Sequence, residues 1–332
     1  MNFPILKVRS MELYLVTGVA GFIGSRVASM IIERGDRVVG IDNVNDSYST
    51  EIKEHRLELL QKYHAFTFIQ MDLSDLINLD KDVGSLEIAA VVHLAARAGV
   101  RQSVLNPSMY LESNVIGTLN VLEFIRRQNI SKFILASTSS VYGRNESQPV
   151  RETGESSFAL SPYAASKKAA EVLTHTYHHL YGIDASILRF FTVYGPRGRP
   201  DMSIFKFMRA IVEGESLTLF GDGGKRDFTY IDDTAIGVLK SLELRGFNII
   251  NLGSDRPIAV VDVIRMIEEC AGQVASVTVH ERDPSDVLST WADISKAKNL
   301  LGWEPTVSIK EGIKETYDWY VENREWAKSI TG

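Results

Sequence analysis

A tyrosine and a lysine four residues apart lie in the stretch SPYAASKK, which covers residues 161–168. On a helix this spacing places Tyr163 and Lys167 on one face, one turn apart. A phenol ionises near pH 10, so Tyr163 can act as a base near neutrality only if its pKa falls by about three units. A positive charge at about 4 Å supplies about 4 kcal/mol at an effective dielectric of about 20, which is enough. The alternative is a solvated Tyr–Lys pair on an amphipathic helix.

A glycine-rich turn indicates where a dinucleotide would bind. GVAGFIG places three glycines between the apolar run LYLVTG and the helical spacing of FIGSRVASMIIERG. Gly18 permits a tight turn, Gly21 lets the backbone approach a pyrophosphate, and Gly24 lets helix and strand pack closely. Asp42 ends the following apolar run, where its carboxylate would bind the adenosine ribose and repel a 2′-phosphate. The pattern favours NAD over NADP, although glycines also mark ordinary turns.

Other residues at predicted strand ends would line the same ligand. Asp72 ends one apolar run and would contact adenine, and the small residues of HLAA end the next run, where a backbone passes close to a cofactor. Simple packing also explains those alanines. The residues that we expect to contact NAD are Gly18, Gly21, Phe22, Ile23, Gly24, Asp42, Asn43, Asp72, Leu73, Leu94, Ala95, Ala96, Asn114, Ser137, Tyr163, Lys167 and Phe190.

Hydroxyl groups follow another apolar run, KFILAST, which covers residues 132–138. Its continuation, ASTSSVYG, would lie at the carboxyl edge of a parallel sheet, close to the nicotinamide. The helix that carries Tyr163 and Lys167 comes next along the chain. The chain has a glycine triad, then a hydroxyl-rich strand end, then the Tyr-xxx-Lys pair. This order favours an acid/base site over a solvated surface pair.

The elements that must position these residues alternate along the chain. Apolar runs at 13–18, 37–42, 66–72, 88–96, 132–138 and 185–191 are separated by segments of helical length. Strands that alternate with helices predict an α/β fold with a doubly wound parallel sheet. We expect residues 11–191 to form this Rossmann-like domain, with about 232–254 packing back on it. Beyond 192 the alternation loosens, which suits a smaller C-terminal lobe over residues 192–332.

Composition excludes several classes of protein. The 332 residues carry a net charge of −6, with a pI near 5.7, so no nucleic-acid surface is expected. A single cysteine, Cys270, excludes an internal disulfide and indicates a reducing compartment. No stretch approaches the roughly 18 apolar residues of a membrane span, and MNFPILKVRS lacks the apolar core of a signal peptide. We expect a cytoplasmic protein without a membrane or metal site.

The chain resembles the extended short-chain dehydrogenases/reductases over residues 11–325. The resemblance is carried by GIDNVNDSY, HLAARAGVRQS, ASTSSVYG, SPYAASKKAAE, RFFTVYGPRGRPDM and RDFTYIDD. Within that superfamily it is similar to the nucleotide-sugar epimerases and dehydratases, most of all to the UDP-glucuronate 4-epimerases. The resemblance implies that NAD is the cofactor and that the catalytic residues are Thr138, Tyr163 and Lys167.

The mechanism implied by the resemblance is reversible oxidation at C4 of a UDP-sugar. Tyr163, as phenolate, takes the proton of the 4-hydroxyl while hydride passes from C4 to NAD. Thr138 hydrogen-bonds the same oxygen, and Lys167 together with the positive nicotinamide ring of NAD⁺ keeps the tyrosine ionised. The 4-keto sugar then turns over and takes hydride back on its other face. A non-catalytic NAD-binding module is the competing class, but such a protein has no need of all three residues.

The identity of the sugar rests on hydroxyl groups. The resembling 4,6-dehydratases carry an Asp-Glu pair after the catalytic threonine and the decarboxylases a nearby glutamate, whereas this chain has Ser139 and Ser140. Together with Thr192, these hydroxyls would hold the carboxylate of a uronic acid charged, which opposes loss of CO₂ from the β-keto acid. The alternative is that they serve a 6-hydroxymethyl group, as in a UDP-glucose or UDP-N-acetylglucosamine 4-epimerase.

The nucleotide end of the substrate needs cations and a flat apolar surface. Arginines are expected at the diphosphate because a guanidinium binds phosphate bidentately, although each could be a surface ion pair. By resemblance, Asp286 would bind the uridine ribose, Phe220 would lie against uracil, and Arg101 would face the sugar or be structural. The expected UDP-sugar contacts are Arg101, Thr138, Ser139, Ser140, Thr192, Arg199, Phe220, Arg226, Arg282 and Asp286. Relatives also commonly dimerise through two helices per subunit, here roughly 107–128 and 161–181.

Overall fold

The computed structural model describes residues 10–74, 76–144, 147–281 and 287–330. Its centre is a seven-stranded sheet in the order β11-β6-β5-β4-β1-β2-β3, in which every neighbouring pair is parallel. The predicted doubly wound sheet is therefore confirmed. The strands are β1 (Leu13–Thr17), β2 (Arg37–Asp42), β3 (Phe66–Gln70), β4 (Ala90–His93), β5 (Lys132–Thr138), β6 (Asp184–Phe190) and β11 (Phe247–Leu252).

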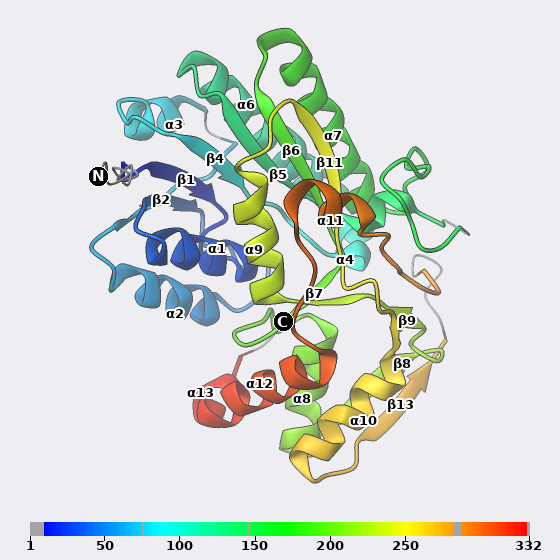
Figure 1. The fold of residues 1–332 in the computed structure, drawn as a ribbon. Helices are drawn as coiled ribbons and strands as arrows, with labels where there is room; N and C mark the ends of the chain where they lie inside the picture. Colours follow the sequence, from blue (N-terminus) through cyan, green and yellow to red (C-terminus); the bar gives the residue numbers. More distant parts are fainter. Residues whose placement is uncertain (1–9, 75, 145–146, 282–286, 331–332) are drawn as a thin grey trace, which may run out of the picture.

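Helices cover both faces of this sheet (Figure 1). The central strands are apolar throughout because both of their faces are buried. One face packs against α1 (Phe22–Glu33), α2 (Thr50–Gln61), α9 (Ile231–Ser241) and α11 (Ser295–Leu301). The other face packs against α3 (Leu76–Val83), α6 (Gly117–Arg127) and α7 (Pro162–Tyr181).

Short elements occupy the edge of the sheet where its strands end. They are α4 (Val100–Leu105), α5 (Pro107–Leu111), the π-helical segment η1 (Glu112–Ile116) and the 3-10 helix η2 (Ser139–Tyr142). The predicted strands 66–72 and 88–96 both end earlier than expected, at residues 70 and 93. The residues after them leave the sheet to form the turns at this edge.

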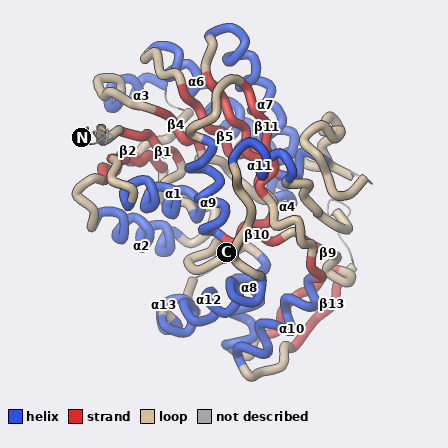
Figure 2. Tube along the Cα trace, in the orientation of Figure 1, coloured by secondary structure: helices blue, strands red, loops and turns tan. Residues whose placement is uncertain are grey.

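A second hydrophobic core lies below the sheet, in the lobe that Figures 1 and 2 show beneath it. Three two-stranded sheets and several helices belong to this part of the chain. The elements are β7 (Thr192–Tyr194), α8 (Ser203–Glu213), β8 (Ser216–Phe220), β9 (Lys225–Arg226), β10 (Phe228–Tyr230), β12 (Ile258–Ala259), α10 (Val260–Ala271), β13 (Ser276–His280), α12 (Ile309–Glu322) and α13 (Arg324–Ala327).

Two segments after residue 192 return to the large sheet. β11 pairs with β6 at its edge, and α9 packs against α1. Helix α11, which the sequence analysis assigned to the lobe, also packs against α9 and β11 because its apolar residues Ala297 and Leu301 are buried in the core of the sheet. The division of the chain at residue 191 stays a prediction.

Candidate active site

The glycine-rich loop between β1 and α1 leaves room for close backbone contact. Gly18 has a φ of +71°, and a Cβ there would lie 2.6 Å from the backbone nitrogen of Ala95. A Cβ on Gly24 would lie 2.0 Å from the carbonyl oxygen of Gly18. Gly21 precedes the first residue of α1, so the loop ends at the free amide groups of a helix N-terminus. This arrangement fits a pyrophosphate, which needs amide donors and no intruding side chain.

Asp42 lies at the carboxyl end of β2, beside this loop. Its carboxylate accepts hydrogen bonds from the Ala20 amide at 3.1 Å and the Val44 amide at 2.8 Å. Burial raises the pKa of Asp42, and these hydrogen bonds oppose the rise. On the next strand end, the Asn43 side chain donates to Asp72 at 2.7 Å. The predicted ribose and adenine contacts are therefore grouped at one corner of the sheet.

A chain of hydrogen bonds fixes the turn that follows β4. The Ala95 amide donates to the Thr17 hydroxyl at 3.3 Å, which bonds Nδ1 of His93 at 2.7 Å. Nε2 of His93 bonds the Thr118 hydroxyl at 3.1 Å, and that hydroxyl donates to the carbonyl of Asn114 at 2.6 Å. Since Thr118 donates onward, it accepts from His93, which assigns a proton to Nε2. Burial lowers the pKa of His93 to about 3.

Asn114, a predicted NAD contact, uses its side chain within the protein. It lies in η1, where its Oδ1 accepts from the Arg97 amide at 2.8 Å and its Nδ2 donates to the Arg97 carbonyl at 3.0 Å. Nδ2 also lies 2.9 Å from the Ser166 hydroxyl, which donates to the Tyr163 carbonyl at 2.8 Å. Asn114 therefore ties the turn after β4 to α7, and its direct contact with NAD stays a prediction.

The three predicted catalytic residues come from the end of β5 and the first turns of α7. The Ser161 hydroxyl caps α7 by accepting a first-turn amide at 3.2 Å, which starts the helix just before Tyr163. The Thr138 side chain lies close enough to the phenol of Tyr163 to lower its pKa. Lys167 lies one turn further along the same helix face and is only 2% exposed.

The side chains around Tyr163 supply only part of the charge that an ionised phenol requires. Burial raises the pKa of Tyr163, and the Thr138 side chain and the Arg199 guanidinium lower it only in part. Burial also lowers the pKa of Lys167 to about 8, although the charge of Glu171 opposes this. The chain alone therefore does not acidify the phenol, because desolvation outweighs the nearby charges. A phenolate at neutral pH requires a further positive charge.

A buried ion pair behind these residues joins α7 to β5 and β6. The Glu171 carboxylate is 2% exposed and accepts two hydrogen bonds from Arg189, at 2.9 Å and 2.7 Å. It also accepts the Ser137 hydroxyl at 2.6 Å and lies 3.4 Å from the Lys168 ammonium. Ser137, a predicted NAD contact, thus directs its hydroxyl to Glu171.

A cavity of about 170 Å³ brings the predicted sugar contacts together. Ser139 and Ser140 from η2, Thr192 from β7 and Arg226 from β9 line it. The Thr138 hydroxyl donates to the Ser140 hydroxyl at 3.2 Å and accepts the Ser140 amide at 3.1 Å. Among the described residues that line this cavity, none is acidic and the only charged one is Arg226. The cavity can therefore hold an anionic sugar next to Thr138.

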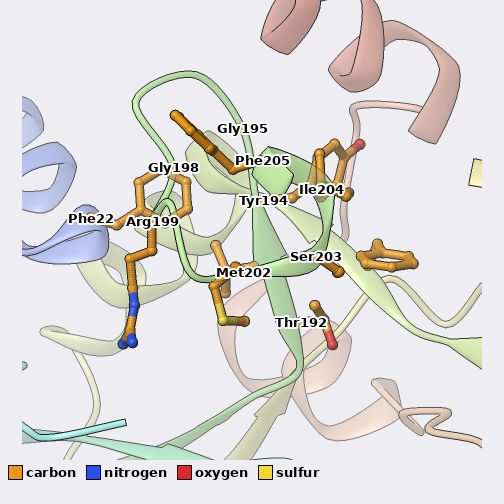
Figure 3. Close-up of a pocket in the computed structure, with 12 residues that line it drawn as sticks. Phe22, Thr192, Tyr194, Gly195, Gly198, Arg199, Met202, Ser203, Ile204 and Phe205 are labelled. Carbon is orange, nitrogen blue, oxygen red and sulfur yellow. The ribbon is translucent and has the colours of Figure 1, made fainter. Parts of the chain in front are cut away.

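Arg199 lies at a smaller cavity that Thr192 also lines (Figure 3). Its guanidinium donates to both oxygens of Asp201, at 2.9 Å and 2.6 Å, and to the carbonyl of Ala98 at 3.3 Å. Its charge acts on Tyr163, whose pKa it lowers. The structure thus places Arg199 close to the phenol, with its orientation fixed by a carboxylate.

The residues predicted for the nucleotide lie on the lobe and on α4. Arg226 donates to the carbonyl of Leu288 at 3.3 Å. The guanidinium of Arg101, from α4, lies over the ring of Phe220, from β8, at 3.8 Å from its centroid. This cation–π contact joins the edge of the large sheet to the lobe. Two further predicted contacts lie outside the described residues, namely Arg282 and Asp286.

The remaining predicted NAD contacts are mainly apolar. Leu73, Phe22 and Phe190 are 8%, 8% and 7% exposed, and Phe190 belongs to the core on one face of the sheet. Ile23 and Leu94 are partly buried against the same core, whereas Ala96 is exposed. Direct contact of each with NAD stays a prediction.

One residue that organises the site has no signal in the sequence. Arg56, on α2, is 1% exposed and donates to the carbonyl of Ala20 in the glycine-rich loop at 3.1 Å. It also donates to the carbonyls of Arg197 and Gly198 at 2.6 Å and 3.2 Å. Arg56 thereby holds the dinucleotide loop and the loop of Arg199 together. In the sequence it lies in EIKEHRLELLQ, which reads as a solvated helix.

The described residues contain no group of three or more histidine, cysteine or acidic side chains that could hold a metal ion. Within the same part of the chain, no helix has the length and apolar character that crossing a membrane requires.

Comparison with known proteins gives consistent matches along nearly the whole chain. The family described as GDP-mannose 4,6 dehydratase matches residues 15–316. The UDP-glucuronate 4-epimerase of Thermodesulfobacterium geofontis is 50% identical over 322 residues, which cover 96% of this chain and 99% of that protein.

Solved structures agree with this match. The UDP-glucuronic acid 4-epimerase of Bacillus cereus, in complex with UDP-glucuronic acid and NAD, is 38% identical with a TM-score of 0.87, over 93% of this chain and 99% of that one. The UDP-glucose 4-epimerase of Thermotoga maritima, with UDP-glucose, is 31% identical with a TM-score of 0.87, over 94% and 99%.

Proposed function

This chain belongs to the GDP-mannose 4,6 dehydratase family of extended short-chain dehydrogenases/reductases, and from that membership we propose that it is an NAD-dependent UDP-glucuronate 4-epimerase. The observation that carries the choice of sugar is the cavity beside Thr138, which Ser139, Ser140 and Thr192 line without an acidic side chain among its described residues. The identity of 50% to a UDP-glucuronate 4-epimerase supports the same choice.

The residues of the glycine-rich corner would hold NAD. The loop of Gly18, Gly21 and Gly24 and the start of α1 would bind its pyrophosphate, and Asp42 its adenosine ribose. When bound, NAD supplies a hydride acceptor, which later serves as donor, and a positive ring at the end of the site where Tyr163 and Lys167 lie. That ring would add the further positive charge that an ionised Tyr163 requires, because burial raises the pKa of the phenol.

The chain's own residues manage the proton at the sugar 4-oxygen. The phenolate of Tyr163 accepts the proton of the 4-hydroxyl as C4 is oxidised, and returns it when C4 is reduced. Thr138, which lies close enough to Tyr163 to lower its pKa, would donate a hydrogen bond to that oxygen. Lys167, one turn away and buried, stabilises the phenolate. Inversion follows when the 4-keto sugar presents its other face before reduction, so there is no net oxidation.

The hydroxyl groups of the cavity would preserve the uronate. Oxidation at C4 makes a β-keto acid, which loses CO₂ when its carboxylate charge can flow into the ketone. Hydrogen bonds from Ser139, Ser140 and Thr192 stabilise that charge on the carboxylate and hold the group in one orientation. We assign Arg199 to the same end of the substrate, because it lies close enough to lower the pKa of Tyr163.

The nucleotide end of the substrate would lie over the lobe of residues 192–332. Arg226 would bind the diphosphate and Phe220 would lie against uracil. Because the Arg101 guanidinium covers the Phe220 ring, it would have to move away or stack on the opposite face of the uracil. Two further contacts belong to this end by resemblance, namely Arg282 and Asp286.

Turnover of purified enzyme with three UDP-sugars tests the proposal. UDP-glucuronate, UDP-glucose and UDP-N-acetylglucosamine are each incubated with enzyme and NAD, and the 4-epimers are separated by ion-exchange chromatography. UDP-glucuronate should be epimerised with the highest kcat/KM, and Tyr163→Phe should lower kcat by about 10²-fold or more while NAD stays bound. Preference for a neutral sugar would reassign the hydroxyls to a 6-hydroxymethyl group. No turnover of any of the three would leave an NAD-binding module.

We also propose that the enzyme is a homodimer in a reducing, cytoplasmic compartment. Helices α4 to α7 carry large apolar side chains that are exposed in the single chain. Leu105, on α4, and Leu180, on α7, are 72% and 60% exposed, and α4 packs against α7. A second copy of the chain would cover these side chains. The single, unpaired Cys270 supports the compartment.

A further inference from the structure

A cavity of about 510 Å³ lies between α1, α2, the start of α9 and the loop that follows β7. Of the residues that line it, only Phe22 belongs to the set expected to bind NAD or the sugar. The volume falls in the range of small-molecule sites, which is about 300–1,000 Å³. The cavity therefore has room for a ligand and no part in the proposed reaction.

Basic side chains outnumber the available carboxylates in this cavity. Arg26, Arg56, Lys62 and Arg197 line it together with three acidic residues. The acidic residues are already engaged. Asp232 accepts both of its hydrogen bonds from Arg26, at 2.7 Å and 2.9 Å. The other two acidic residues also accept hydrogen bonds from residues that line the cavity. Glu33 accepts one from the Arg26 guanidinium at 3.4 Å, and Glu315 accepts one from the Tyr230 hydroxyl.

The guanidinium of Arg197 is left without a partner among the described residues. It is half-buried, and no hydrogen bond or ion pair joins it to another described side chain. Burial and the charges of Arg26 and Arg56 lower its pKa, and the charge of Asp232 opposes this only in part, so the guanidinium is partly desolvated and lies near other cations. Its backbone is held in place, with a φ of +60° and a carbonyl that accepts Arg56 at 2.6 Å. A fixed, partly desolvated cation among other cations is a site for an anion.

We propose that this cavity binds a small oxyanion, a phosphate or carboxylate group of a metabolite, through the guanidinium of Arg197. Lys62 and the Tyr63 side chain line the same cavity and would complete the contacts. Arg197 is separated from Arg199 only by Gly198, whose carbonyl Arg56 also holds. An anion on Arg197 would therefore be attached to the backbone segment that carries Arg199 to the catalytic tyrosine.

Calorimetric titration of the full chain tests the site. The enzyme is first saturated with NAD and UDP, so that the diphosphate and pyrophosphate subsites are filled. Inorganic phosphate and malonate are then titrated separately, with chloride at equal ionic strength as reference. We expect phosphate, malonate or both to bind with one site per chain, and Arg197→Gln to weaken that binding by about tenfold or more. The two anions distinguish a phosphate ligand from a carboxylate ligand.

Arg245→Gln serves as the matched control, because the Arg245 side chain is 82% exposed and lies at the far end of β11. This variant should bind the anions as the unaltered enzyme does. Anions that bind no better than chloride, or equal affinity in Arg197→Gln, would overturn the proposal. Because the measurement is the heat of binding, it does not depend on which sugar is the substrate.

Discussion

At the scale of single residues, we propose that three hydroxyl groups decide whether the oxidised sugar keeps its carboxylate. A hydrogen bond to a charged group is worth about 1.5–3 kcal/mol. Thr192→Val removes one such bond in the 170 Å³ cavity with little change of shape. We expect the ratio of decarboxylated UDP-pentose to epimerised product to rise about tenfold, as measured by chromatography of the UDP-sugars.

The matched control is Thr176→Val, which removes an exposed hydroxyl on α7. Its product ratio should equal that of the unaltered enzyme. An unchanged ratio in Thr192→Val would show that Thr192 does not bind the carboxylate.

His93 makes the stability of the fold depend on pH. Its pKa is about 3 in the fold, against about 6.5 in an unfolded chain, so only the unfolded state gains a proton between these values. The contribution of His93 to the free energy of unfolding should therefore be constant above pH 6.5 and should fall below it, by at most about 1.4 kcal/mol per pH unit.

Chemical denaturation at pH 7.5 and pH 5.5 measures this effect. His93→Gln should lower stability at both pH values, because Thr17 and Thr118 lose a partner, but should show a smaller difference between them. His64→Gln, at an exposed position, should keep the difference of the unaltered chain. If the stability of His93→Gln changed between the two pH values as much as that of the unaltered chain, the result would contradict a neutral buried imidazole.

At the scale of elements, Arg56 couples two loops that come from different parts of the fold. Arg56→Gln would leave the buried carbonyls of Ala20 and Arg197 without their donor. We expect a loss of about 2–4 kcal/mol in the free energy of unfolding and weaker binding of NAD. Glu58→Gln, exposed on the same helix, should change neither quantity. Unchanged NAD affinity in a stable Arg56→Gln protein would rule out the coupling.

Local sequence patterns predicted the elements better than the contacts between them. The order of strands and helices and the glycine loop follow from periodicity and from glycine's freedom at positive φ, as at Gly18. The spacing of Tyr163 and Lys167 likewise depends only on a helix. Arg56 had no such signal, because its partners at Arg197 and Gly198 are far away in the sequence and are backbone carbonyls.

The charge state of the site was also beyond local patterns. The cations near Tyr163 can be named from the sequence, but the desolvation that raises its pKa cannot, because burial depends on the whole packed structure. For the same reason, the use of Asn114 and Ser137 within hydrogen-bond networks could not be read from their positions at predicted strand or helix ends.

At the scale of the whole molecule, exposed apolar side chains favour a dimer. Leu105→Glu places a charge on the side formed by α4 and α7 and should convert the dimer to a monomer in sedimentation equilibrium. Val274→Glu is the control, since Val274 is 89% exposed between α10 and β13 in the lobe. This variant should stay dimeric. A monomeric mass for the unaltered chain, or a dimer in Leu105→Glu, would contradict this interface.

The proposed epimerisation requires that the sugar is oxidised and reduced at C4 within one site. UDP-glucuronate carrying deuterium at C4 tests it, with the product analysed by mass spectrometry and proton NMR. We predict UDP-galacturonate that retains the deuterium at C4, with no NADH accumulating in solution. Product that has exchanged this deuterium for a solvent proton, or the absence of any 4-epimer, would contradict the account.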